Sequence, residues 1–399
     1  MIPPFSIARL PRIEFGAGRI GQLPGIAARY GKQLLIVTGS RSFTASPQWE
    51  ALRQALDEAQ FTHTTVRIAG EPSPDDIDTI VQDHRRHEYD LVIGIGGGSV
   101  LDAAKAIAGL LRSGNTVMDY LEGVGPELPF SGPAAPYIAV PTTAGTGSEA
   151  TKNAVLTRHG ADGFKKSFRD EALMAQYAII DPDLLASCPP GQIAANGMDA
   201  CTQLLEAYCS SRANPLTDAL ALTGLKAVRD GLSSWYDGGD GAATGREKMA
   251  LAALLSGICL AQTGLGSVHG LAQPLGSFFP IAHGVVCGTL VAAATRVNIE
   301  AMQARTPDHP TLAKYASVGR LLGGDPHAGA QAARDALLHT LQAWTIHMNL
   351  PYLSNLGVAE ADFARIVANA RGSSMQTNPV ELSDAEIDRI LRLRFVGPV

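Results

Sequence analysis

A glycine turn between a predicted strand and a predicted helix constrains the fold of this chain more than any other feature. The apolar run Leu91–Ile95 leads directly into three consecutive glycines and Ser99, and residues 100–108 then show the apolar spacing of a helix. A parallel strand followed by a crossover helix is the arrangement that such a sequence favours. The chain is therefore predicted to contain a parallel α/β sheet.

The three glycines of this turn, Gly96, Gly97 and Gly98, suit a phosphate group. Without side chains they let backbone N–H groups come close to an anion, and the helix N-terminus adds unpaired donors and partial positive charge. The turn does not match the G-x-G-x-x-G fingerprint of dinucleotide-binding proteins. Two interpretations therefore stay open at this point, a pyrophosphate site and a tight turn without a ligand.

The two halves of the chain differ in their apolar pattern. The first half has short runs rich in Val and Ile at residues 33–38, 90–95 and 137–140. Between the runs, amphipathic helices are predicted at residues 46–59 and 74–88, with Ser73 as the N-cap of the second. The second half has long Ala- and Leu-rich segments with helical spacing, of which the clearest cover residues 215–231, 246–262 and 330–348.

The pair Pro189-Pro190 marks the change between the two patterns. A chain of 399 residues also exceeds the usual size of a single hydrophobic core. We therefore predict an α/β domain over residues 1–188 and an all-helical domain over residues 189–399.

Composition excludes several classes of partner. The net charge is -6 and no run of Lys or Arg forms a basic patch, so no nucleic acid partner is expected. The five cysteines are odd in number and include no Cys-x-x-Cys pair, which argues against a disulfide framework and a zinc ribbon. No signal-like N-terminus and no run of 18 apolar residues is present, so we predict a cytoplasmic protein without a membrane partner.

A second loop, at residues 140–149, follows the predicted strand at residues 137–140. It carries four hydroxyl side chains and two glycines. Clustered hydroxyls donate hydrogen bonds to phosphate or ribose oxygens, and they equally satisfy the backbone of their own turn. The residues alone leave both roles open.

The two loops, in this order and about 45 residues apart, resemble those of the iron-containing (group III) alcohol dehydrogenase family. The resemblance runs from Phe15-Gly16 to about Asn378-Pro379. Further matching stretches are Asp181–Leu184, Gly197–Ala200, Glu206–Tyr208, Val268–Ala272 and His283-Gly284. Several independent motifs at matching spacing make a chance similarity a poor explanation.

The resemblance implies a fold of the dehydroquinate-synthase-like type, with a dinucleotide-binding domain at residues 1–188 and a metal- and substrate-binding helical domain at residues 189–399. It implies an NAD(P)-dependent enzyme that interconverts an alcohol and its aldehyde or ketone by hydride transfer. A small-molecule substrate and a homodimer are implied as well. The cofactor would lie in a cleft between the domains, and the residues implied to line its site are Gly97, Gly98, Ser99, Asp102, Thr142, Thr143 and Lys166.

The residue after Val37-Thr38 bears on the choice of dinucleotide. Family members that prefer NAD often carry Asp there, where a carboxylate bonds the ribose hydroxyls and repels a 2′-phosphate. This chain has Gly39 and Ser40 instead, followed by Arg41, whose charge suits a phosphate. We therefore predict NADP in preference to NAD, with Gly39 and Ser40 in the cofactor site.

The resemblance also implies a metal site, which the family builds from one Asp and three His. Asp199, His269 and His283 match three of these ligands, and the third histidine is replaced by Gln203. Gln203 follows Asp199 by four residues, so both side chains share one helical face and can converge on one Fe(II) or Zn(II) ion. The alternative is a metal-free site in which Asp199 and Gln203 link helices and both histidines are ordinary core residues.

No catalytic side chain is predicted apart from the metal site. Asn153 stands where the family places a polar substrate contact, although a structural Asn is the alternative. Gln273 replaces a histidine that the family often has near the nicotinamide, which argues against a proton relay there. Competing hypotheses are a metal-independent enzyme of the maleylacetate reductase type, a dehydroquinate-synthase-like lyase, and a nucleotide-binding protein without turnover. The sequence does not name the substrate.

Overall fold

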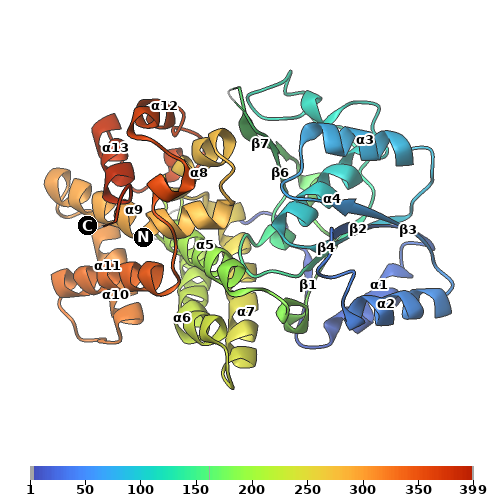
Figure 1. The fold of residues 1–399 in the computed structure, drawn as a ribbon, viewed down its shortest axis with the longest axis horizontal. Coiled ribbons are helices and arrows are strands. Elements are labelled where there is room, and N and C mark those ends of the chain that lie inside the picture. The colour runs from blue at the N-terminus through green and yellow to red at the C-terminus, as the bar shows by residue number, and fades with distance from the viewer. Residues whose placement is uncertain (1–3, 161, 398–399) are drawn as a thin grey trace. The chain divides into compact units, whose positions relative to one another are not determined.

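The computed structural model describes residues 4–160 and 162–397, which form two compact units (Figure 1). The α/β unit comprises Ala8–Arg158 and Gly163–Cys188. The helical unit comprises residues 189–397 together with residues 4–7, 159, 160 and 162. This combination of a parallel α/β unit and a helical unit confirms the predicted fold class.

The α/β unit is built on a six-stranded parallel sheet. Its strand order is β1 (Arg12–Phe15), β8 (Tyr177–Ile180), β5 (Tyr137–Pro141), β4 (Leu91–Gly96), β2 (Gln33–Gly39) and β3 (Thr62–Ile68). Every residue of β4 and β5 is buried, as expected for central strands with helices on both faces. The continuous Val and Ile runs of the sequence therefore correspond to the middle of the sheet.

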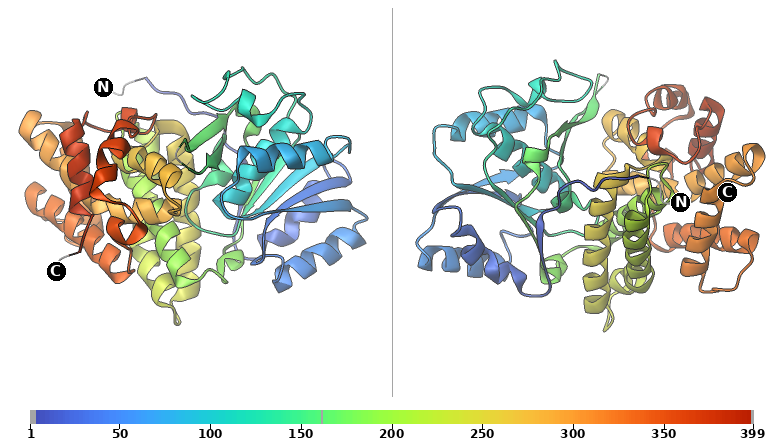
Figure 2. Two further views of the ribbon diagram at one scale, coloured as in Figure 1. Left: turned by 45° about the horizontal axis from the view of Figure 1, so that its top comes forward. Right: turned by 180° about the vertical axis from the view of Figure 1, so that it is seen from behind.

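Helices cover both faces of this sheet (Figures 1 and 2). The short α1 (Leu23–Ala27) and α2 (Pro47–Glu58) lie on one face, and α3 (Pro74–His84) and α4 (Gly98–Leu110) lie on the other. An antiparallel hairpin of β6 (Asn153–Arg158) and β7 (Phe164–Arg169) packs against α4.

The strand order reverses direction between β2 and β4. From β2 the chain proceeds outward to β3 at one edge, and from β4 it proceeds to β5 and β8 on the opposite side. Helices on either side of such a switch point diverge, which opens a crevice at the carboxyl ends of the strands where ligands bind in open α/β sheets. Because Thr38 pairs with Ile95 and Gly96 pairs with Pro141, the turns that follow β2, β4 and β5 all leave this edge.

The predicted helix at residues 74–88 is shorter in the structure and ends at His84. Its N-terminus is as expected, since Ser73 and Asp76 form a capping box. At the other end Arg85 is the C-cap, and the chain then makes a turn in which the His87 N–H donates to the His84 carbonyl. The polar residues 85–88 continue the helical composition but belong to the connection into β4.

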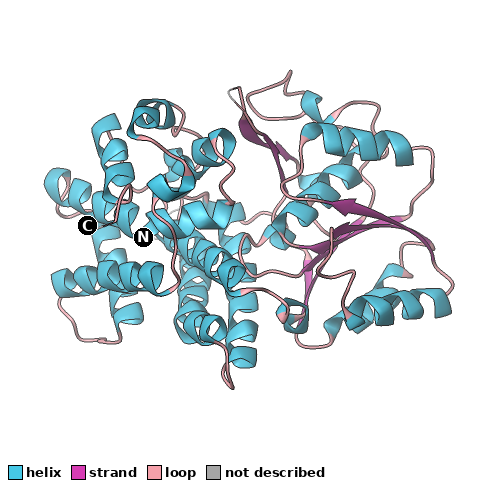
Figure 3. Cartoon of the chain, in the orientation of Figure 1, coloured by secondary structure: helices cyan, strands magenta, loops and turns pink. Residues whose placement is uncertain are grey.

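The second half contains only helices and turns among its described residues (Figure 3). Its α-helices are α5 (Pro190–Cys209), α6 (Pro215–Asp237), α7 (Ala242–Thr263), α8 (Ser267–Phe278), α9 (His283–Arg305), α10 (Pro310–Gly323), α11 (Ala330–His347), α12 (Phe363–Ala368) and α13 (Asp384–Leu393). The segments predicted at residues 215–231, 246–262 and 330–348 correspond to α6, α7 and α11.

Helix α9 has the length and mean hydropathy, 1.3, of a membrane-spanning helix, and the bent pair of α7 and α8 passes the same test with a 99° bend. However, 78% of the apolar window of α9 is buried inside the protein, where α5 and α8 pack against it. Such burial is typical of the core helix of a globular unit.

We expect a side chain at Gly94 to disturb the packing of α4 on β4. A Cβ atom there would lie 2.8 Å from the Ala104 Cβ of α4 and 3.2 Å from the Tyr137 ring. Gly94→Ala should therefore destabilise the protein by about 1–3 kcal/mol through overpacking, measured as a lower midpoint of thermal unfolding. Adding Ala104→Gly should recover part of this loss despite the poor helix propensity of glycine. Equal stability of Gly94→Ala and the parent chain would contradict this packing.

Candidate functional site

The glycine turn after β4 forms an open helix N-terminus. Helix α4 begins at Gly98, and its N-cap, Gly97, provides no side-chain hydrogen bond to the first turn. A Cβ atom on Gly98 would lie 2.6 Å from Thr146 Oγ1, and one on Gly97 would lie 3.3 Å from Thr143. The turn after β4 therefore packs directly against the hydroxyl-rich loop after β5. The uncapped N–H groups of a thirteen-residue helix and the surrounding hydroxyls suit a phosphate group.

The end of β2 lies beside the start of the same helix. A Cβ atom on Gly39 would lie 3.8 Å from Val100 Cγ2, which is an ordinary van der Waals distance. Gly39 is half-buried and Ser40 is exposed. Position 39 therefore has room for a side chain. Because it is a glycine, no carboxylate stands beside the start of α4 at the end of β2.

A buried lysine connects α4 to the hydroxyl-rich loop and to β6. The Lys105 ammonium is fully buried and lies 3.0 Å from Asp102 Oδ1, 2.9 Å from Thr151 Oγ1 and 2.5 Å from the Asn153 carbonyl oxygen. Burial lowers the pKa of Lys105, while the Asp102 carboxylate opposes this shift. Its three ammonium protons thus have three acceptors, as a buried charge requires.

Asp102 is held from two sides, because its Oδ1 also accepts a 2.5 Å hydrogen bond from Ser148 Oγ. Thr142 joins the glycine turn through its backbone N–H, which donates to the Gly96 carbonyl. Lys166 lies on β7, with its Nζ beside Gly123. The structure therefore brings Asp102, Thr142 and Thr143 together around the turn and places Lys166 on the neighbouring hairpin.

Two further positions were considered for substrate contact or proton transfer. Asn153 is the half-buried first residue of β6, and its carbonyl serves the Lys105 ammonium. Gln273 is half-buried on α8, and its side-chain oxygen lies close to Gly372. Neither arrangement assigns a chemical role to these side chains.

Four ligand-type atoms converge within the helical unit. Asp199 of α5, His269 of α8, and His283 and Cys287 of α9 bring one ligand atom each within 4.8 Å of one another. Asp199 Oδ1 lies 3.3 Å from His269 Nε2 and 3.7 Å from His283 Nε2. The Cys287 sulfur lies 3.6 Å from His269 Nε2 and 3.7 Å from His283 Nε2. We refer to these four residues as the α5–α9 cluster.

Two glycines of α9 allow this convergence. A Cβ atom on Gly284 would lie 2.6 Å from the Ala195 carbonyl oxygen of α5, and one on Gly288 would lie 2.9 Å from Met198 Cβ. The two helices therefore approach each other more closely than side chains permit. Each glycine directly follows a member of the cluster, so the close approach delivers His283 and Cys287 to Asp199.

Glu206 orients His269. Its carboxylate lies 2.7 Å from His269 Nδ1 and accepts the Val268 and Gly266 backbone N–H groups at 2.7 Å and 3.0 Å. A carboxylate accepts hydrogen bonds, so Nδ1 carries a proton, and Nε2 is the ring atom that would bind a cation of the cluster. A carboxylate behind a ligating histidine is the usual support of a metal site.

The cluster fits a cation better than it fits an ion-free core. Asp199 Oδ1 and Gln203 Oε1 are buried oxygens without a hydrogen-bond partner among the described residues. Burial opposes the ionisation of Asp199, yet His283 and His269 lower its pKa below the ordinary value. Convergent carboxylate oxygen and imidazole nitrogen donors are a donor set that Fe(II) and Zn(II) take.

Gln203 lies on the same face of α5 as Asp199 but is turned toward the other carboxylate oxygen. Its Nε2 lies 3.5 Å from Asp199 Oδ2, whereas both histidines face Oδ1. The structure thus brings the predicted Asp199, Gln203, His269 and His283 into one region.

Glu206 and Cys287 belong to this region but were not predicted from the sequence as site residues. A signal existed for both, since Asp199, Gln203 and Glu206 recur on one helical face and Cys287-Gly288 repeats His283-Gly284 one turn later. Burial raises the pKa of the Cys287 thiol to about 12, so it is protonated at neutral pH in the absence of a cation.

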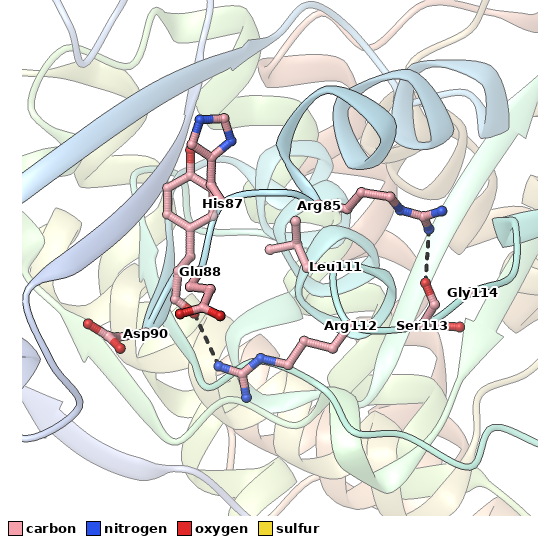
Figure 4. A pocket seen from close by; sticks show the side chains of 9 residues that line it. Arg85, His87, Glu88, Asp90, Leu111, Arg112, Ser113 and Gly114 are labelled. Atoms are coloured by element: carbon pink, nitrogen blue, oxygen red, sulfur yellow. Dashed lines mark hydrogen bonds between the residues drawn. The ribbon is translucent and has the colours of Figure 1, made fainter.

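A separate surface pocket lies on the α/β unit at the opposite end of β4 and α4 (Figure 4). Its lining residues come from the segment just before β4 and the segment just after α4. The pocket therefore lies away from the carboxyl ends of the strands. Arg85 Nη2 donates to the Ser113 carbonyl at 2.9 Å, and Arg112 Nη2 donates to the Tyr89 carbonyl at 3.1 Å. Both guanidinium groups thus join the segment before β4 to the segment after α4, across the pocket. The lining residues are Arg85, His87, Glu88, Tyr89, Asp90, Leu111, Arg112, Ser113 and Gly114.

Comparison with known proteins matches both units to one family. The family model "Iron-containing alcohol dehydrogenase" matches residues 11–182, and "Fe-containing alcohol dehydrogenase family, C-terminal" matches residues 193–395. Alcohol dehydrogenase 4 of Schizosaccharomyces pombe is 32% identical over 393 residues, which are 98% of this chain and 89% of that protein.

Solved structures agree with these matches. The crystal structure of a 1,3-propanediol oxidoreductase superposes with a TM-score of 0.88 at 26% identity, covering 98% of this chain and 100% of that one. Sulfoacetaldehyde reductase from Bifidobacterium kashiwanohense, in complex with NAD+, gives a TM-score of 0.83 at 27% identity over 98% of this chain and 99% of that one.

Glu149, in the hydroxyl-rich loop, should make stability depend on pH. Burial raises its pKa to about 7 from the ordinary value of 4.5. The folded state therefore holds the proton more tightly than the unfolded state, so the carboxyl destabilises the fold progressively as pH rises from about 4.5 to 7. Relative to the parent chain, Glu149→Gln should gain on the order of 3 kcal/mol between pH 4.5 and pH 8, seen in thermal unfolding midpoints.

The exposed Glu88 supplies a control, because Glu88→Gln removes a carboxylate that is solvated in the folded state. A constant difference between Glu149→Gln and the parent chain across this pH range would show that the Glu149 carboxyl does not titrate there.

Proposed function

Because the chain belongs to the iron-containing alcohol dehydrogenase family, we propose that it interconverts a small-molecule alcohol and its aldehyde or ketone, with NADP as the preferred hydride carrier and a divalent metal ion in the α5–α9 cluster. NAD(P)-dependent alcohol dehydrogenase activity comes with the family. The coenzyme preference, the ion and the residues that hold them are our proposal. The observation that carries it is the buried cluster with its unsatisfied oxygen atoms.

The α/β unit is proposed to bind the dinucleotide at the carboxyl ends of β2, β4 and β5. The backbone N–H groups of Gly98 and Ser99 would donate to the pyrophosphate, where the α4 N-terminus adds partial positive charge. Thr142 and Thr143 supply hydroxyls on the facing loop, and Asp102 is held in place by Lys105. The related sulfoacetaldehyde reductase structure, which contains NAD+, supports a dinucleotide as the ligand of this fold.

The helical unit is proposed to hold the ion through Asp199, His269 and His283, with Gln203 adjacent. A bound Fe(II) or Zn(II) ion would act as a Lewis acid on the substrate oxygen and stabilise the charge that grows there during hydride transfer. Glu206 keeps the His269 ring oriented with Nε2 toward the site. Burial of Asp199 and His269 excludes water, which strengthens every charge interaction in the site.

Three further features are part of the proposal. Residues 1–188 would form the dinucleotide-binding domain and residues 189–399 the metal- and substrate-binding domain. We also propose a cytoplasmic location, in keeping with five cysteines that form no disulfide among the described residues, and a homodimer, which rests on the resemblance. The retained Asp199 and both histidines favour metal-assisted reduction over a metal-independent maleylacetate reductase.

Removal of the metal should abolish most of the activity. We expect purified protein to oxidise NADPH with members of an aldehyde panel, and chelation to lower kcat by about 100-fold or more, because a Lewis acid contributes several kcal/mol to this chemistry. Addition of Fe(II) or Zn(II) should restore the rate, and Asp199→Asn should not respond to either ion. Full activity after chelation, especially with maleylacetate, would instead support the metal-independent enzyme.

Gly39 should set the coenzyme preference. Gly39→Asp places a carboxylate beside Val100, where the structure has room, and this charge should repel the 2′-phosphate. We expect kcat/KM for NADPH to fall at least about tenfold relative to NADH, a difference of about 1.4 kcal/mol. Gly39→Asn is the matched control, because it has the same shape without the charge. A parent chain that uses NADH at least tenfold better than NADPH would refute the preference.

A further inference from the structure

We propose that Cys287 is the fourth protein ligand of the ion, in place of the histidine that this chain lacks, and that the resulting set of Asp199, His269, His283 and Cys287 favours Zn(II) over Fe(II). This inference rests on the proposed metal-assisted function and specifies its metal. It concerns a residue outside the ligand set that the family resemblance implies.

Four of the six distances among the ligand atoms match a tetrahedral zinc site, and the other two are within 4.8 Å. With usual zinc bond lengths, tetrahedral ligand atoms stand about 3.3 Å apart for nitrogen and oxygen and about 3.6 Å apart for nitrogen and sulfur. The corresponding distances are 3.3 Å and 3.7 Å from Asp199 Oδ1 to the two histidines. From the Cys287 sulfur to the same two nitrogens they are 3.6 Å and 3.7 Å. All four distances agree to within a few tenths of an ångström.

Helix geometry explains why the sulfur reaches the cluster. His283 and Cys287 are four residues apart on α9 and therefore share one face. Gly284 and Gly288 bring that helix against the Ala195 carbonyl and Met198 of α5, so the sulfur is fully buried next to Asp199. The unsatisfied Asp199 Oδ1 is an independent sign that this space takes a cation.

Gln203 is the competing ligand, and its orientation disfavours that role. Its amide nitrogen lies 3.5 Å from Asp199 Oδ2, whereas both histidine nitrogens contact Asp199 Oδ1. In this orientation the amide NH₂ group donates toward the carboxylate and does not ligate, and a ligand role for Gln203 Oε1, which accepts no hydrogen bond from the described residues, is what the Gln203→Ala variant tests. Gln203 is therefore assigned as a positioning residue that holds the Asp199 carboxylate, while the sulfur occupies the remaining ligand position.

Charge balance favours the same assignment. On binding, the Cys287 thiol loses its proton to solvent and the sulfur–metal bond forms, with no change in oxidation state. Counting direct ligands alone, one thiolate and one carboxylate neutralise a divalent ion, whereas an amide in place of the thiolate leaves part of the balance to the Glu206 carboxylate behind His269. Thiolate with imidazole ligands in a tetrahedral arrangement selects zinc.

Cobalt substitution tests the sulfur ligand directly. The protein is stripped of metal and loaded with Co(II), which gives an intense near-ultraviolet charge-transfer band only where a thiolate is bound. The band should be present in the parent chain and in Gln203→Ala, and it should be lost in Cys287→Ser. Cys259→Ser is the matched control, because Cys259 is another buried cysteine of the helical unit and its hydrogen bond to the Thr217 carbonyl suits a serine hydroxyl.

Metal selection supplies the second readout. Loaded anaerobically with equal Fe(II) and Zn(II), the parent chain should bind one equivalent of zinc with at least a tenfold preference, and Cys287→Ser should lose most of that preference. Circular dichroism confirms that each variant is folded. If Cys287→Ser fails to fold, the sulfur ligand is tested by the Co(II) charge-transfer band of the parent chain and by its ratio of bound zinc to bound iron.

The outcomes separate this inference from the proposed function. Bound Co(II) without the band, a band that survives in Cys287→Ser, or preferential iron loading overturns Cys287 as a ligand and leaves a metal-assisted dehydrogenase intact. A parent chain that binds no metal overturns both the ligand and the metal-assisted mechanism. A sulfur-bound ion in a protein that oxidises neither NADPH nor NADH with the aldehyde panel supports the site and overturns the dehydrogenase proposal.

Discussion

Close backbone contact, made possible by glycine at a few positions, is the constraint on which both halves of this structure depend. In the α/β unit, Gly94 lets α4 lie directly on β4 and β5, and Gly98 lets the turn after β4 pack against the loop after β5. In the helical unit, Gly284 and Gly288 let α9 approach the backbone of α5. Side chains at these positions would separate the elements whose proximity creates the two candidate sites.

Buried charge is the second theme, and the two units handle it differently. In the α/β unit the Lys105 ammonium finds three acceptors, so the charge is compensated within the chain. In the helical unit Asp199 and Glu206 flank opposite nitrogens of His269, and one Asp199 oxygen makes no hydrogen bond with any described residue. The proposed divalent ion would supply the compensation that the second arrangement lacks.

The exchange of a histidine for Gln203 looks like the loss of a ligand when the sequence alone is considered. In the structure the same region contains Cys287 of α9, whose sulfur lies 3.6 Å and 3.7 Å from the Nε2 atoms of the two histidines, a spacing that lets all three atoms bind one ion. A thiolate changes the charge of the site as well as its preferred ion, because two anionic ligands leave a divalent ion neutral. Lower positive charge on the ion would weaken its pull on the substrate oxygen, so substrate orientation by the chain would carry more of the catalysis.

The sequence by itself determined the strands at residues 33–38, 90–95 and 137–140, the helical second half, the glycine turn and the spacing of Asp199, His269 and His283, because each lies within one element or in a family-like motif. Even there, the end of α3 at His84 was missed, since the polar residues 85–88 fit a helix and a connection equally. Only the tertiary structure decided which side chains meet. The burial of Lys105, the Glu206 support of His269 and the place of Cys287 depend on how α4, α5, α8 and α9 pack, and local spacing does not encode the contacts between separate elements.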